Sequence, residues 1–187
     1  MVAMMDDWRD VLGAGVAVAL ELPLAPSTRA VTPGDTMARL LESIAALEDG
    51  TPTRPKDEPP VPELQRLEMK IDLLTDLVST LFAERIPRPV GVLVSAEGLV
   101  VPAVLLPPDC DRVELYPCHW LAQPLVLELG RVTERGGWCG APWRAAGPVL
   151  RDALERFVFR LHRRDIARRR MRVEEVRTNP AAGTHVP

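Results

Sequence analysis

Residues 62–85 have the sequence PELQRLEMKIDLLTDLVSTLFAER, and this stretch decides how the chain is organised. Its apolar residues recur at alternating spacings of three and four, the heptad pattern of helices that pack together as a coiled coil. The positions of this pattern are Leu64, Leu67, Ile71, Leu74, Val78 and Leu81. The pattern predicts that several copies of the chain associate through this helix. An ordinary amphipathic helix lying on its own domain has a similar pattern, and this alternative stays open.

The residue types in this helix do not decide between two, three and four copies. Ile71 and Val78 at the first heptad position, with Leu at the fourth, favour a two-stranded coiled coil. Leu73 and Leu77 widen the apolar stripe beyond these positions, which suits a larger bundle.

Prolines mark the boundaries on both sides of this helix. Pro62 fits the first helical turn, and Pro87 and Pro89 end the helix. Residues 51–62 contain five prolines among charged residues, which predicts a stiff, extended linker. Residues 36–48 have the apolar spacing of a short amphipathic helix, whose packing partner, its own barrel or the helical bundle, stays open.

The remaining chain has the alternation and the turn residues of short β-strands. Residues 11–24 predict a first strand that ends at Pro23 and Pro26, and residues 150–161 predict a closing helix with one apolar face. Further strands are predicted at residues 89–94, 98–106, 111–119 and 125–133, with turns at 96–98, 107–109 and 136–137. The fold class is therefore predicted to be α+β, with a small barrel or sandwich of about five strands.

These patterns divide the chain into four regions. Residues 1–30 hold the first barrel strand, and residues 31–88 form a helical insertion that includes the linker and the heptad helix. Residues 89–170 supply the rest of the barrel and the C-terminal helix. Residues 171–187, with no periodicity after Val176, are expected to be a disordered tail.

Charge and composition exclude several classes of protein. The chain has 187 residues, 47% of them apolar, and a net charge of −3, which gives no general attraction to nucleic acid. Its three cysteines form no CxxC pair and its histidines have no ligand spacing, so neither disulfides nor a metal site is predicted. No Gly-rich phosphate loop, nucleophile elbow or paired histidine motif is present, which indicates a protein that is not an enzyme and needs no cofactor.

The sequence also carries no signal for membrane insertion or export. The start of the chain has three acidic residues and no basic run before an apolar stretch, so we expect a cytoplasmic protein. The longest apolar run, residues 11–20, is shorter than the ~20 residues of a membrane-spanning helix, so no membrane span is expected.

Residues 95–101, SAEGLVV, and 157–164, FVFRLHRR, carry a resemblance to a known family. A Ser-x-x-Gly turn between two strands, with a closing amphipathic helix, resembles the PilZ domain, the bacterial receptor module for cyclic di-GMP. A strand followed by a heptad helix and then the rest of the barrel resembles the atypical PilZ subgroup of xanthomonads. The resemblance implies a six-stranded β-barrel with an inserted coiled-coil helix, assembled as a homotetramer through a parallel helical bundle.

The ligand motifs of PilZ receptors are incomplete in this chain. No Arg-x-x-x-Arg motif precedes Ser95, and Leu93 stands where the second motif has Asp or Asn, whose hydrogen bonds a leucine cannot make. Ser95 and Gly98 of that motif remain, and the resemblance implies ligand contacts for them.

The closing helix offers a different place for an anion. Residues 151–172 contain nine arginines against three acidic residues. Arg160, Arg164 and Arg168 share a helix face and are candidate anion or nucleotide contacts. A solvated cationic helix end that complements its own dipole is the alternative, and it stays open.

Together these features predict a bacterial signalling adaptor. In this interpretation the heptad helix multiplies a PilZ-like domain that acts through protein partners, in virulence or motility by family analogy. A cyclic di-GMP receptor with a non-standard arginine-rich site is the alternative. Nucleic acid is not an expected partner, because the arginine-rich helix has few aromatic residues for base stacking.

Overall fold

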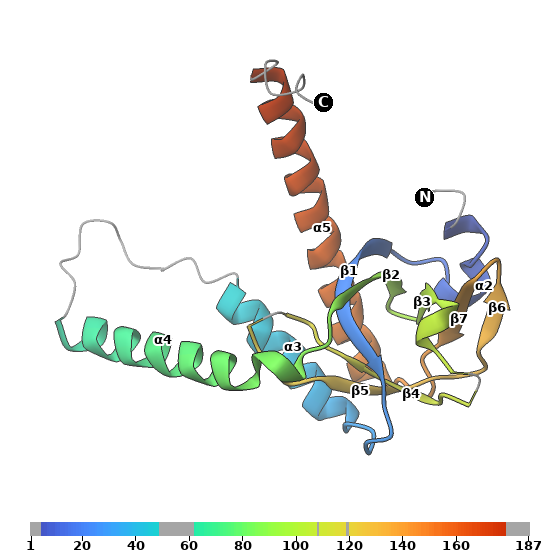
Figure 1. Ribbon diagram of the computed structural model, residues 1–187, viewed down its shortest axis with the longest axis horizontal. Coiled ribbons are helices and arrows are strands. Elements are labelled where there is room, and N and C mark those ends of the chain that lie inside the picture. The colour runs from blue at the N-terminus through green and yellow to red at the C-terminus, as the bar shows by residue number, and fades with distance from the viewer. Residues whose placement is uncertain (1–4, 49–61, 108, 119, 179–187) are drawn as a thin grey trace.

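The computed structural model describes residues 5–48, 62–107, 109–118 and 120–178 (Figure 1). It confirms the α+β class, with helices packed around a seven-stranded antiparallel sheet of order β5-β4-β1-β2-β3-β7-β6. The strands are β1 (Ala17–Pro26), β2 (Pro89–Ser95), β3 (Gly98–Pro102), β4 (Arg112–Leu115), β5 (Leu125–Glu128), β6 (Thr133–Arg135) and β7 (Trp138–Pro142).

The expected six-stranded barrel differs from the observed sheet in strand number and in closure. In the described part of the chain, β5 and β6 are the edge strands, and no ladder joins them. A single bridge between Leu129 and Trp143 brings the segments after β5 and β7 together. β1 bends the sheet, because Ala17–Pro23 pairs with β2 while Leu24–Pro26 pairs with β4.

The prediction of a strand from residue 11 was wrong at its start, whereas its predicted end at Pro26 is confirmed. Val11 and Leu12 belong to helix α2 (Arg9–Leu12), which ends at Gly13 in the left-handed region with φ of 71°. The strand begins at Ala17, passes through Pro23 and ends at Pro26. Pro23 is tolerated because it lies where β1 changes partner, and its carbonyl accepts the Tyr116 N–H at 3.0 Å.

The hairpin of β6 and β7 was not predicted, although its turn was. Gly136 and Gly137 have φ of 55° and 81°, the two positive values that a tight two-residue hairpin needs. The expected strands at 98–106, 111–119 and 125–133 are shorter in the structure. The first of them ends in a 3₁₀ turn, η2 (Ala103–Leu105).

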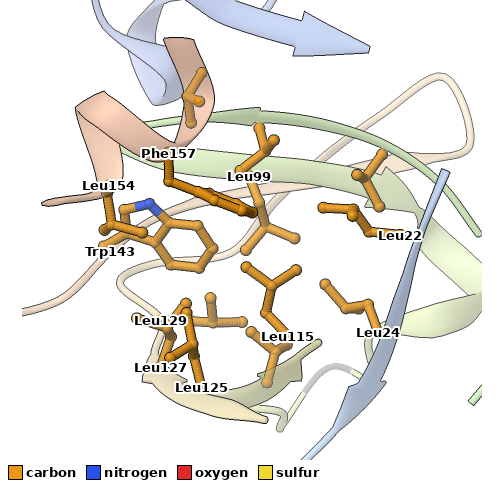
Figure 2. Packing of buried hydrophobic residues seen from close by; sticks show 14 of the residues in the cluster. Leu22, Leu24, Leu99, Leu115, Leu125, Leu127, Leu129, Trp143, Leu154 and Phe157 are labelled. Atoms are coloured by element: carbon orange, nitrogen blue, oxygen red, sulfur yellow. The ribbon is translucent and has the colours of Figure 1, made fainter. Parts of the chain in front are cut away.

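The core lies between the sheet and helix α5 (Pro148–Thr178), as the apolar face of the closing helix predicts. Figure 2 shows Leu154 and Phe157 of α5 lying against Trp143 and the leucines of the strands. Helix α3 (Gly34–Glu48) packs on α5 through its buried face, Met37, Ala38, Leu41 and Ile44. The first amphipathic helix therefore packs on its own domain.

A second cluster lies under α2. Trp8, Val11 and Leu12 cover Leu93 and Val100 of the sheet, and all five are buried. The guanidinium of Arg135 in β6 donates to both carboxylate oxygens of Asp10, at 2.9 and 2.6 Å, and lies 4.9 Å from the centre of the Trp8 ring. The hydrogen bond from Arg135 lowers the pKa of Asp10.

The C-terminal helix is longer than expected. α5 continues to Thr178, past the boundary at residue 170, so residues 171–178 of the expected disordered tail are helical. Its last turns extend beyond the sheet (Figure 1). Residues 179–187 lie outside the described residues, as do residues 51–61 of the expected linker.

Gly140 tests the packing of α2. A Cβ at Gly140 would lie 2.5 Å from the Trp8 ring, so Gly140→Ala forces the ring to move and should lower the free energy of unfolding by about 1–3 kcal/mol. Gly91→Ala is the matched control, because nothing lies within 4 Å of its added Cβ. Urea unfolding followed by tryptophan fluorescence measures both variants. Equal stabilities would contradict the packing of Trp8 on β7.

Candidate functional site

The heptad stretch forms helix α4 (Pro62–Phe82), followed by the 3₁₀ turn η1 (Ala83–Arg85). Its 21 residues make a rod about 31 Å long that projects away from the sheet (Figure 1). Every described side chain of α4 is exposed. The predicted packing positions are 42% to 75% exposed: Leu64, Leu67, Ile71, Leu74, Val78 and Leu81.

The heptad pattern was compatible with a helix that joins several chains and with a helix that lies on its own domain, and this exposure decides between them for the single chain. The alternative, in which α4 lies on its own domain, does not hold. Leu73 and Leu77, exposed by 60% and 52%, extend the bare apolar face. An apolar face of this extent on a helix is a candidate site for protein association.

A polar cluster of the sheet lies beside the base of α4. The Tyr116 hydroxyl lies 3.0 Å from Glu114 Oε2 and 3.5 Å from the carbonyl oxygen of Arg85 in η1. Because a hydroxyl has one hydrogen, it donates mainly to the nearer, charged carboxylate. Burial, and then the hydrogen bond to Glu114, raises the pKa of Tyr116. Ser27 Oγ donates to the other oxygen of Glu114 at 2.9 Å.

Ser95 uses its hydrogen-bonding groups within the β2–β3 hairpin. Its side chain is buried, and Oγ accepts the N–H groups of Glu97 and Gly98, both at 3.1 Å. The hydroxyl lies 3.3 Å from the Gly98 carbonyl, to which it donates. The Ser95 carbonyl accepts the indole N–H of Trp143 at 3.2 Å. Ser95 therefore stabilises the turn.

Gly98 is required by close packing. A Cβ there would lie 2.7 Å from the carbonyl oxygens of Ala141 and Val11, so no side chain fits. Both remaining residues of the Ser-x-x-Gly motif thus have structural roles. The ligand contacts that the resemblance implies for them stay a prediction.

Leu93 has lost the chemistry of the motif and gained a packing role. It is 3% exposed and lies in the cluster formed by Trp8, Val11, Leu12 and Val100. A carboxylate at this position would be buried in apolar surroundings, at a cost of several kcal/mol. The position is therefore closed to a polar ligand in this structure.

The arginines predicted as anion contacts lie along α5, and two of them bind α3. Arg160 Nη2 donates to the Leu41 carbonyl at 3.2 Å, and Arg164 Nη1 lies 2.8 Å from Glu48 Oε2. Arg168 is exposed. The structure does not bring these arginines to Ser95 and Gly98, whose neighbours are α2 and β7.

Two hollows that share Arg160 were not predicted, the first between α3 and α5 and the second along α5. The first, of about 270 Å³, is lined by Leu41, Glu42, Ala45, Ala153, Arg156, Phe159 and Arg160. The second, of about 280 Å³, is lined by Arg160, Arg163, Arg164 and Ala167. Phe159 and Arg163 are four residues apart, so the sequence indicates that they share one face of the helix. The small residues Ala45 and Ala153 gave no sign in the sequence that they line a hollow.

The described residues hold no group of three or more metal-ligating side chains. Burial raises the pKa of the Cys118 thiol to about 11, so it is a poor nucleophile at neutral pH. None of the described helices is both long and apolar enough to cross a membrane.

Comparison with known proteins agrees with this fold. A family model described as "Atypical PilZ domain, cyclic di-GMP receptor" matches residues 41–171. The chain belongs to the atypical PilZ domain family, which confirms the resemblance seen in the sequence. No relative was found among curated proteins.

A solved structure from Xanthomonas campestris is similar over nearly its whole length. Its sequence is 28% identical to this chain, and the two structures compare with a TM-score of 0.71. The match covers 87% of this chain and 97% of that chain. It is described as a pathogenic protein with a new tetrameric PilZ domain, self-assembled through an unusual helical bundle.

Ser95→Ala tests the structural role of the motif. It leaves the buried N–H of Gly98 without its side-chain acceptor, so the free energy of unfolding should fall by about 1–3 kcal/mol. Ser43→Ala in α3 is the control, because that hydroxyl is exposed and bonds within its own helix. Urea unfolding compares the two, and a Ser95 variant as stable as the control would refute the role.

Proposed function

We propose that this protein is a non-enzymatic signalling adaptor, in which the α4 helices of several copies pack together and join their PilZ domains. The observation that carries the proposal is the bare apolar stripe of α4. Full burial of a Leu, Ile or Val side chain contributes about 1.5–3 kcal/mol, so a bundle of such stripes has a large driving force.

We further propose a homotetramer with parallel α4 helices. The width of the stripe, which includes Leu73 and Leu77, supports more than two helices. The tetrameric assembly of the X. campestris protein also supports this number. Such an assembly would present several copies of one surface to a partner, and avidity would then strengthen otherwise weak contacts.

A cyclic di-GMP receptor is the second candidate function, and the description of the matching family favours it. The buried Leu93 and the involvement of Ser95 in its own turn count against a site at the β2–β3 hairpin. A receptor function would therefore need another surface, such as the arginines of α5. The partners in signalling, and any role in virulence or motility, belong to the proposal as well.

Leu74→Asp tests the assembly. It places a carboxylate in the packed seam, where an unpaired buried charge costs several kcal/mol, so the multimer should dissociate. Met69→Asp is the matched control, because Met69 is on the opposite side of α4 and is 71% exposed. Light scattering coupled to size-exclusion chromatography should give a multimer for the native chain and the control, and a smaller species for Leu74→Asp. A monomeric native chain would sink the proposal.

The adaptor and the receptor differ in their response to nucleotide. The adaptor predicts no heat of binding when cyclic di-GMP is titrated by calorimetry, and no change in mass on the column. Saturable binding would instead favour the receptor. Loss of that binding in Arg164→Glu, with retention in Ser95→Ala, would place the site on α5.

A further inference from the structure

The apolar hollow between α3 and α5 has an unusual exposed aromatic residue. Phe159 is 49% exposed, although its neighbours Phe157 and Val158 are buried in the core. Its ring borders the hollow, where Leu41, Ala45 and Ala153 also contribute apolar surface. The side chains of the two alanines are small, so the two helices leave room there for an apolar side chain from outside.

Positive charge continues from this hollow along α5. Arg156 and Arg164 form ion pairs with Glu42 and Glu48 of α3, each at 2.8 Å, so these two guanidinium groups are neutralised. Arg163, which lines the second hollow, is exposed. In the described ranges of the chain, Arg163 has no carboxylate partner. The surface thus combines an apolar hollow with an unneutralised guanidinium group, that of Arg163, about one helical turn from Phe159.

We propose that the two hollows together form a groove, the α3–α5 groove, that docks an acidic, amphipathic helical segment of a partner protein. The inference rests on the proposed adaptor function, because it names the surface that the assembly multiplies. One apolar side chain of the partner fills the hollow beside Phe159. Carboxylates of the partner meet Arg163 at the second hollow, whose lining contains three arginines and no carboxylate. Charge complementarity selects an acidic partner, and the apolar hollow supplies the anchor.

The dimensions of the groove fit a short helix. From Ala153 to Ala167 the surface follows α5 for about 21 Å, which corresponds to roughly 14 residues of helix. A protein segment fits these features better than nucleic acid does. A phosphate backbone would use the arginines but leave the apolar hollow empty, and Phe159 alone gives little stacking surface.

The test selects peptides on the full-length protein. A displayed library of random peptides about 15 residues long, the length of the groove as a helix, is enriched on the native chain. Binders to the double variant Phe159→Ser with Arg163→Glu are removed by counter-selection. The enriched peptides should have an excess of Asp and Glu around one aromatic or aliphatic anchor. Failure to enrich such peptides overturns the proposal.

An enriched peptide, labelled with fluorescein, is then measured by fluorescence anisotropy. Its affinity should fall about tenfold or more in Phe159→Ser and in Arg163→Glu separately. Arg151→Glu is the control, because Arg151 is exposed on the same helix but lines neither hollow, and its affinity should be unchanged. Circular dichroism checks the fold of each variant. Affinities that do not differ between these variants overturn the proposal.

Two competing occupants are included as probes. The first probe is a peptide of residues 62–82 of this chain, and the second is vesicles containing anionic phosphatidylglycerol. The proposal is overturned if the acidic peptides do not bind the native chain, while one of these probes does bind it and loses this binding in Phe159→Ser. Light scattering on the same samples separates this inference from the assembly. A multimer without peptide binding refutes the groove alone, whereas a monomer that binds the peptide refutes the bundle alone.

Discussion

The burial of one apolar face of α5 against the sheet is the interaction on which the rest of the structure depends. Leu154, Phe157 and Val158 close the core beside Trp143. The same helix also packs against the buried face of α3, and Arg156 and Arg164 form ion pairs with Glu42 and Glu48 across this contact. α4, in contrast, does not pack against this assembly of sheet, α3 and α5, and its described side chains are exposed.

The β2–β3 hairpin shows how a ligand motif can lose its chemistry and keep its geometry. Ser95 and Gly98 meet structural demands, a capped turn and a close approach to β7, that exist whether or not a ligand binds. The third position of the motif, Leu93, is not needed to form the turn, and its side chain packs under Trp8. The part of the motif that remains is therefore the part that the fold itself requires.

Much of the fold could be predicted from periodicity, but pairing could not. The heptads of α4, the face of α5 and the strand that begins at Pro89 have clear local patterns. α2 was missed because four residues give no measurable period, and its stability comes from Trp8 and from Asp10 bound to the distant Arg135. The groove was missed because it depends on how α3 crosses α5, which no local pattern contains.

Helices α3 and α4 show the limit of such patterns most clearly. Both have an apolar stripe at helical spacing, yet Leu41 of α3 is 1% exposed and Leu74 of α4 is 61% exposed. Periodicity predicts that a face will be buried, but not whether the partner is the same chain or another. The connection from α4 to β2 is short, passing through η1. A bundle of α4 helices would therefore hold one domain at the end of each helix, and a partner with repeated acidic segments could engage several α3–α5 grooves at once.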